Sequence, residues 1–385
     1  MIENFEFILP TEIQFGRGCI SMLPDQIRDR NYVRPLIVTD KGLIKTGIIG
    51  AVEKLFIEAG IEYLVFSDTV PNPRDHDCDA GAKFAREVSA DVLVAVGGGS
   101  AMDTAKAIAT IKTNGGTARD WFDVELDEVS APVICIPTTC GTGAEVTYNA
   151  VITNSTTRLK ANIFDPKCAP VLALVDPDLL DGLPKHLIAS TGMDALTHAV
   201  EAYVCKIATP MTDTLALQAM RLINGSIRKA VEKDKDALDQ LMLGSLLAGI
   251  SFGNSDTAAV HSIAECFGGF YDIPHGVTNA IFLPDVCAFS LPGNYKKYAN
   301  VANILGADTV GLPVEEAAKK TVEKIEELAK ELGIPLLSSF DSINEDDFEY
   351  LADETSKHCC NENNPIEGTK EDYLAIFYKV FAKTG

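Results

Sequence analysis

The chain has 385 residues, of which 46% are hydrophobic and 23% are charged, a composition typical of a globular protein with room for two domains. Its 33 basic and 55 acidic residues give a formal net charge of −22, which argues against nucleic acid or an anionic membrane surface as a partner. No run reaches the roughly 18 apolar residues of a membrane span, and the first residues lack the pattern of a signal peptide. The ten cysteines form no CxxC pair, so we expect free thiols in a reducing cytoplasm.

Short apolar runs alternate with helical stretches as far as about residue 183. Five runs rich in Val and Ile are bounded by turn residues and predict buried strands, at residues 35–40, 62–67, 91–96, 132–137 and 171–177. Helical segments such as 43–60 and 101–112 lie between them. This alternation predicts a parallel sheet covered on both faces, and therefore a Rossmann-like α/β domain over residues 1–183.

The periodicity changes after Pro184. Bounded strand-like runs almost disappear, and helical patterns follow at residues 185–204, 211–231, 235–250, 257–268, 314–332 and 370–383. In the fifth of these an apolar stripe runs along one face, Lys and Glu cover the rest, and Gly333 with Pro335 ends the pattern. Residues 184–385 are therefore predicted to form an all-helical domain.

A glycine-rich turn follows one of the predicted strands. The sequence DVLVAVGGGSAMDTAKAIA places Gly97, Gly98, Gly99 and Ser100 between a strand and a helix. Glycines let the backbone approach a phosphate closely, and the free N–H groups of the next helix point at the anion. The turn lacks GxGxxG spacing, and a plain strand–helix turn is the alternative. A second loop, IPTTCGTGAEVT, adds the hydroxyls of Thr138 and Thr139 at the carboxyl end of another strand, where ligands bind in open α/β sheets.

Asp40 ends the first predicted strand, where a carboxylate can accept hydrogen bonds from the ribose of adenosine. A negative charge there would repel a 2′-phosphate, which favours NAD over NADP. The alternative interpretation is that Asp40 caps the helix that follows.

Three of the six histidines and one aspartate form a pattern that suits a metal site. Asp194 and His198 are four residues apart in STGMDALTHAVEAYV, so both project from one face of a helix. His261 and His275 follow in AVHSIAECFGGFYDIPHG. Three imidazoles and a carboxylate suit Fe²⁺, Zn²⁺, Co²⁺ or Ni²⁺ better than Mg²⁺ or Ca²⁺. Each histidine taken alone is more often a hydrogen-bonded core residue.

In this order, the motifs resemble those of the iron-containing (group III) alcohol dehydrogenases over essentially the whole chain. The resemblance runs through LIVTD, VPNP, GGGSAMDTAKA, PTTCGTGAEVT, RLKANIFDP, LVDPDLLDGLP, GMDALTHAVEAY, GGFYDIPHG and NNPIEGTKEDY. It implies the two-domain fold shared with dehydroquinate synthase-like proteins, with cofactor and metal in the interdomain cleft. It also implies NAD and Fe²⁺ as cofactors, with Zn²⁺ or another divalent metal as a substitute.

The resemblance assigns roles to particular residues. The implied cofactor contacts are Asp40, Asn72, Gly97, Gly98, Gly99, Ser100, Asp103, Thr138, Thr139, Thr147 and Lys160. The implied metal ligands are Asp194, His198, His261 and His275. Asn149, Phe252 and Cys360 are placed near the substrate, and with Lys160 and Glu265 they complete the catalytic candidates.

Glu265 marks one departure from the family. Members commonly read HxxxH where this chain reads HSIAE, so a histidine assigned to the cleft near the nicotinamide is Glu265 here. Glu265 is one helical turn after His261 and is able to relay a proton itself. The preferred interpretation is that it supports a ligand through a hydrogen bond.

The expected reaction is hydride transfer between NAD(H) and a small primary alcohol, diol or aldehyde, with the metal polarising the substrate oxygen. A homo-oligomer is expected from the family. One alternative is an NAD- and metal-dependent lyase of the dehydroquinate synthase type, which would need basic residues around the metal to hold a polyanion. The flanking segments SFGNSDTAAV and GGFYD are apolar and acidic instead. The second alternative, a non-catalytic assembly protein that binds metal or NAD, conflicts with a complete ligand set.

Overall fold

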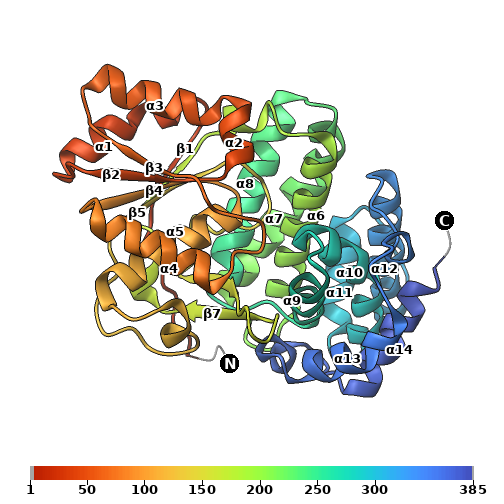
Figure 1. Cartoon of the computed structure of the whole chain (residues 1–385). Helices are drawn as coiled ribbons and strands as arrows, with labels where there is room; N and C mark the ends of the chain where they lie inside the picture. Colours follow the sequence, from red (N-terminus) through yellow and green to blue (C-terminus); the bar gives the residue numbers. More distant parts are fainter. Residues whose placement is uncertain (1–3, 384–385) are drawn as a thin grey trace. The chain divides into compact units, whose positions relative to one another are not determined.

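Six strands form one parallel sheet in the N-terminal half of the chain (Figure 1). The computed structural model describes residues 4–383. The sheet order is β1-β8-β5-β4-β2-β3. The strands are β1 (Glu12–Phe15), β2 (Pro35–Val38), β3 (Leu64–Phe66), β4 (Val92–Gly97), β5 (Val133–Pro137) and β8 (Leu172–Val175). All five strands expected from the apolar runs are present, so the predicted parallel sheet is confirmed.

Helices cover both faces of this sheet, as the alternating pattern predicts. In β2, Leu36 and Val38 join the core beneath α4 (Asp75–Glu87) and α5 (Gly99–Asn114). Ile37 points the other way, into the core beneath α1 (Leu23–Asp29) and α3 (Ile48–Ala59). Successive side chains of a strand face opposite sides, so a strand buried on both sides is apolar at every position. Figure 1 shows these two helix pairs on opposite sides of the strands.

The helix predicted at residues 43–60 is two helices. α2 (Lys41–Thr46) ends and α3 begins at Gly47, whose φ of 87° lies in the left-handed region. Glycine adopts this conformation without the penalty that a Cβ would bring, so it terminates the first helix and redirects the chain. The apolar periodicity continues across the break, which explains why the pattern predicted one element.

Three strands were not expected from the sequence. β1 is a four-residue strand at the edge of the sheet, where β8 is its one partner among residues 4–383. β6 (Asn149–Thr153) and β7 (Lys160–Phe164) form a separate antiparallel pair. These strands are short and partly exposed, so none of them contains a long apolar run.

The chain divides into two units: residues 8–139 with 143–183, and residues 4–7 and 140–142 with 184–383. The second unit is helical. Its longer helices are α6 (Lys185–Val204), α7 (Pro210–Val231), α8 (Lys235–Phe252), α9 (Ala259–Tyr271), α10 (His275–Ser290), α11 (Tyr295–Ile304), α12 (Val314–Glu331), α13 (Phe348–Lys357) and α14 (Lys370–Phe381). All six predicted helices of this half are present, and α10, α11 and α13 are additional.

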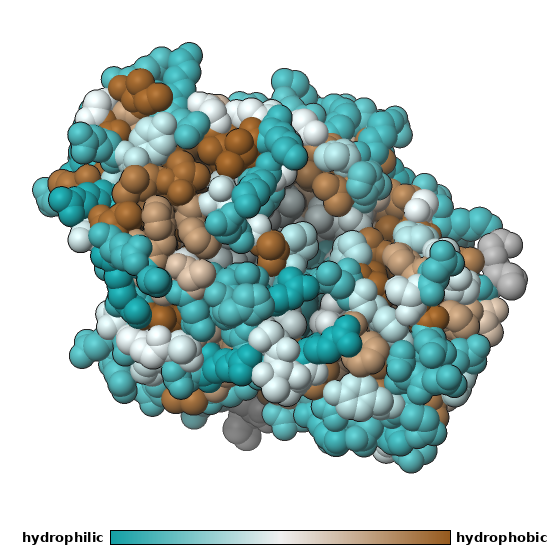
Figure 2. Space-filling model, viewed as in Figure 1, coloured by the Kyte–Doolittle hydropathy of each residue, from teal (hydrophilic) through white to brown (hydrophobic). Residues whose placement is uncertain are grey.

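Hydrophilic residues cover most of the face seen in Figure 2, with smaller apolar areas between them. Within residues 4–383, no helix is both long and apolar enough to cross a bilayer.

Candidate metal centre and cofactor cradle

The four predicted metal ligands come together in the helical unit. Asp194 and His198 lie one turn apart on α6, His261 is in the first turn of α9, and His275 begins α10. One ligand atom from each lies within 4.8 Å of the others. The first three are buried and His275 is half-buried. A carboxylate and three imidazoles at these separations form a donor set for one divalent cation.

Hydrogen bonds at the far side of two rings fix which nitrogen faces the other ligands. Nδ1 of His198 is 3.2 Å from the carbonyl oxygen of Gly141, and Nδ1 of His261 is 2.5 Å from Oε2 of Glu201. A carbonyl and a carboxylate only accept, so each Nδ1 carries the proton and each Nε2 keeps its lone pair. Lone pairs on Nε2 are what a metal ion requires.

Asn279, one turn after His275 on α10, marks the point at which the ligand atoms converge. Its Nδ2 donates to Oδ1 of Asp194 at 2.7 Å and lies 3.1 Å from Nε2 of His261 and 3.2 Å from Nε2 of His275. An amide nitrogen acts only as a donor and has two hydrogens, so besides Asp194 it can donate to the lone pair of one of the two Nε2 atoms at a time. The residues present therefore fit a metal ion.

The environment of the centre favours the neutral form of His198. Burial lowers the pKa of His198 to about 4, against the opposing effect of Asp194. At His261, burial also lowers the pKa, but the facing carboxylate of Glu201 outweighs it and the net shift is upward. The Glu201–His261 pair therefore holds a proton at Nδ1, away from the other ligands.

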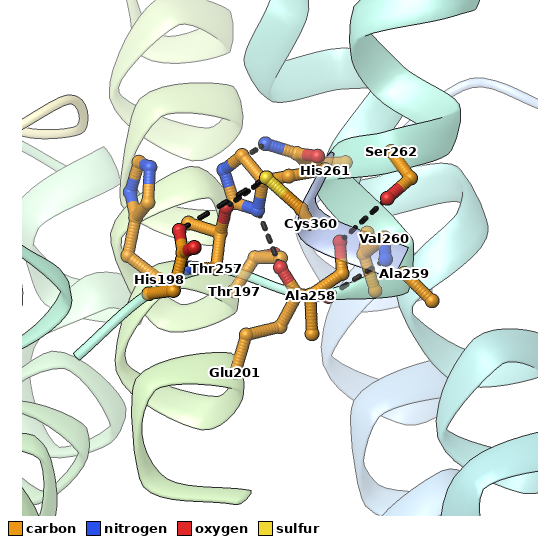
Figure 3. Close-up of polar contacts among 12 residues, drawn as sticks. Thr197, His198, Glu201, Thr257, Ala258, Ala259, Val260, His261, Ser262 and Cys360 are labelled. Carbon is orange, nitrogen blue, oxygen red and sulfur yellow. Dashed lines mark hydrogen bonds and ion pairs between the residues drawn. The ribbon is translucent and has the colours of Figure 1, made fainter. Parts of the chain in front are cut away.

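Glu201 is a residue that the sequence analysis missed. Figure 3 shows its side chain reaching from α6 toward the start of α9, where Oε1 accepts from the backbone N–H of Val260 at 2.6 Å and Oε2 contacts His261. Glu201 follows His198 by three residues and so shares its face of α6. Its partner is 60 positions away, and spacing alone does not reveal that contact.

Substitution of Glu201 by Gln is expected to weaken metal affinity by about 10–100-fold, because the amide cannot hold the His261 ring as a carboxylate does. Competition with a chromophoric chelator measures this affinity directly. The matched control is Glu315→Gln, at an exposed position of α12 in the same unit. Equal affinities in the two variants would show that Glu201 does not support the centre.

The predicted phosphate cradle lies in the α/β unit. Gly97 ends β4, Gly98 is the N-cap of α5, and Gly99 and Ser100 begin that helix. A Cβ on Gly98 would lie 3.2 Å from the side chain of Thr139, which follows β5. The two loops predicted to hold the cofactor therefore lie side by side, with the N–H groups of the α5 first turn at their edge.

Asp40 and Asn72 lie on other loops of this unit. Oδ1 of Asp40 accepts from the N–H of Leu43 at 2.8 Å, so this residue caps α2, as the alternative interpretation proposed. One carboxylate oxygen is used in this way, and a carboxylate has two. Asn72 has a φ of 48°, and its carbonyl oxygen is 3.5 Å from the hydroxyl of Thr153.

Lys106 connects three of the predicted cofactor and substrate residues and was not expected from the sequence. Its side chain is fully buried, and Nζ donates to Oγ1 of Thr147 at 3.2 Å and to the carbonyl of Asn149 at 2.8 Å. Nζ is also 3.7 Å from Oδ1 of Asp103. Burial raises the pKa of Asp103 to about 6, although Lys106 and Lys160 lower it. The ammonium therefore fixes the start of β6 against α5.

Glu145, in the loop that precedes β6, has a buried carboxyl group whose protonation affects the stability of this unit. Burial raises the pKa of its carboxyl from 4.5 to about 7. Between these values the unfolded chain has released the proton and the folded chain retains it. Stability therefore falls as pH rises through this window, by at most about 1.4 kcal/mol per pH unit.

Glu145→Gln removes this dependence, so the variant is expected to lose less stability than the native protein between pH 5 and pH 8. Urea unfolding at the two pH values measures the difference. Glu128→Gln, at an exposed position, is the control and should follow the native protein. A Glu145→Gln variant with the native pH dependence would contradict the burial argument.

Thr138, directly after β5, and Lys160, which begins β7, lie in the α/β unit, and the remaining predicted residues lie in the helical unit. The ring of Phe252 stacks on that of His198, with centroids 4.3 Å apart and an interplanar angle of 15°. Sγ of the buried Cys360 accepts from Oγ1 of Thr257 at 3.2 Å (Figure 3). Oε2 of Glu265 lies 3.0 Å from Nε2 of His358, a partner that the sequence did not suggest.

Comparison with known proteins agrees with the resemblance. The model described as "Iron-containing alcohol dehydrogenase" matches residues 10–177, and "Fe-containing alcohol dehydrogenase family, C-terminal" matches residues 188–381. The chain is 38% identical over 373 residues to the NAD-dependent methanol dehydrogenase of Bacillus methanolicus, covering 96% of this chain and 98% of that one. It is 38% identical over 375 residues to the lactaldehyde reductase of Escherichia coli K12, with the same coverage.

A crystal structure of 1,3-propanediol oxidoreductase superposes with a TM-score of 0.95 at 37% identity, covering 98% of this chain and 100% of that one. The predicted fold class is therefore confirmed, and the lyase alternative is not favoured. Of the cofactors expected from the sequence, iron fits the family and the Asp–His cluster, and NAD fits the family and its NAD-dependent relative. The chain belongs to the iron-containing alcohol dehydrogenase family and is an oxidoreductase of that class.

Proposed function

We propose that the protein is an NAD-dependent dehydrogenase that interconverts small primary alcohols or diols and their aldehydes. The observation that carries the proposal is the convergence of one carboxylate and three imidazoles, with the Nδ1 protons of His198 and His261 held on the outer side. A divalent metal bound by these residues supplies a Lewis acid for the substrate oxygen. The relatives named for methanol, lactaldehyde and 1,3-propanediol support small alcohols and aldehydes as the substrate class.

The chain's own residues contribute orientation and the exclusion of water. Asp194, His198, His261 and His275 would hold the metal, and Glu201 keeps the His261 ring in one orientation. The Phe252 ring covers one face of the His198 ring and keeps water from it. The N-terminus of α5 would bind the pyrophosphate of NAD, while the charge on Asp40 would disfavour the 2′-phosphate of NADP.

The proposal extends to assembly and location. We propose a homo-oligomer in the cytoplasm, which the family and the ten free cysteines support. A net charge of −22 disfavours nucleic acid and anionic membranes as partners.

The test is NADH oxidation by metal-stripped protein with a panel of small aliphatic aldehydes, before and after anaerobic addition of Fe²⁺ or Zn²⁺. We expect negligible turnover without metal, recovery on addition of Fe²⁺, and weaker activity with NADPH. The panel then ranks the substrates. Protein that binds both NADH and metal but reduces no aldehyde would contradict the proposed activity.

A further inference from the structure

A second group of side chains of metal-ligating type lies in the helical unit, where α13 ends and the short 3-10 helix η8 (Cys359–Asn363) begins. It consists of His358, Cys359 and Cys360, and one ligand atom from each lies within 4.8 Å of the others. Sγ of Cys359 is 3.9 Å from Nδ1 of His358 and 3.9 Å from Sγ of Cys360. Cys359 is exposed and Cys360 is buried, so the group lies at the surface.

These separations match the edges of a tetrahedral zinc site. With Zn–S bonds of about 2.3 Å and Zn–N bonds of about 2.0–2.1 Å, tetrahedral ligands are about 3.5–3.8 Å apart. The two distances of 3.9 Å exceed these values by only a few tenths of an ångström. Three protein ligands would leave a fourth position for water.

The His358 ring is oriented as in known metal sites. Its Nε2 lies 3.0 Å from Oε2 of Glu265, and the two side chains are 13% and 9% exposed. A carboxylate only accepts, so Nε2 carries the proton and Nδ1 is the nitrogen available on the side of the sulfur atoms. There the backbone N–H of Cys360 donates to Nδ1 at 3.4 Å. Glu201 holds His261 in the same way, through the opposite ring nitrogen.

The two sulfur atoms have different surroundings. Sγ of Cys359 belongs to an exposed residue and lies close to both of the other ligand atoms. Oγ1 of Thr257 donates to Sγ of Cys360 at 3.2 Å.

We propose that His358, Cys359 and Cys360 form a second metal site for a thiophilic divalent cation such as Zn²⁺, with Glu265 orienting His358. The two centres differ in chemistry. Thiolates select soft and borderline cations, whereas the Asp–His₃ cluster offers only nitrogen and oxygen. Glu265 was expected to support a metal ligand through a hydrogen bond, and in this proposal the ligand it supports is His358.

Cobalt distinguishes the two centres, because only sulfur ligands give a thiolate-to-cobalt charge-transfer band in the near ultraviolet. Full-length, reduced, metal-free protein is titrated with Co²⁺ under anaerobic conditions. We expect the band to saturate at one Co²⁺ in this site, and Zn²⁺ to abolish it by displacement. His261→Ala should retain the band. This variant therefore tests metal binding at His358, Cys359 and Cys360 independently of metal binding at the Asp–His₃ cluster.

Variants assign the band to these residues. Cys359→Ser, at an exposed position, and Cys360→Ser should each abolish it, and circular dichroism confirms that the variants fold. Glu265→Gln should weaken Co²⁺ binding at this site by about 10–100-fold. Cys19→Ser, in the α/β unit, is the control and should leave the band unchanged. No band in the native protein, or a band that survives both substitutions at 359 and 360, would overturn the proposal.

Discussion

Replacement of His261 by alanine is expected to lower kcat/KM for an aldehyde and NADH by about 10³-fold or more. The substitution removes one of the four proposed ligands and leaves Glu201 as a buried carboxylate without its imidazole partner. Loss of metal-assisted polarisation corresponds to several kcal/mol of transition-state stabilisation, and each 1.36 kcal/mol is a factor of ten in rate. Steady-state kinetics measure the loss of turnover, and the metal content after dialysis measures the loss of metal binding.

The chain provides a matched control in His186, an exposed histidine of α6 outside the cluster. His186→Ala should retain native metal content and turnover. A His261→Ala protein that keeps both would show that the chemistry does not depend on the Asp–His₃ cluster.

Gly97→Ala is expected to raise the KM for NADH by at least tenfold, which corresponds to about 1.4 kcal/mol of binding free energy. A Cβ on Gly97 would lie 2.6 Å from Cβ of Ala101, closer than two non-bonded carbon atoms can approach. The start of α5 must therefore shift, and with it the N–H groups proposed to bind the pyrophosphate. Quenching or enhancement of NADH fluorescence on binding gives the Kd independently of turnover.

Gly50→Ala is the control for this change. Gly50 lies inside α3, and a Cβ there would meet no atom within 4 Å. Alanine favours a helix, so this variant should bind NADH normally and unfold no more readily than the native protein. Normal NADH affinity in Gly97→Ala would show that the cradle is placed elsewhere.

Sequence periodicity predicted most of the secondary structure because burial dictates it. The five apolar runs are strands with helices on both sides, so their apolar composition was enough to predict them as buried strands. The break at Gly47 and the β6–β7 pair were missed because a left-handed glycine and short, partly exposed strands leave little trace in an apolar pattern.

The four residues of the Asp–His₃ cluster were also predicted from the sequence, but the residues that orient their side chains were not. Asp194 and His198 share a helical face, and motif order added His261 and His275. Asn279 is one turn after His275, yet Asn is common in helices and carries no metal signature. The contact between Glu265 and His358 joins residues 93 positions apart, and only the tertiary structure brings them together.

The two oxygens of Glu201 impose a constraint of length as well as charge. One oxygen serves the backbone N–H of Val260, near the start of α9, and the other serves the ring of His261, the next residue. Aspartate has the same charge but is one methylene shorter, so from the same position on α6 it would lose reach toward both partners. Position 201 therefore requires glutamate rather than aspartate. Glu201→Asp, usually counted as a conservative substitution, would weaken the hydrogen bonds to both the start of α9 and the ring of His261.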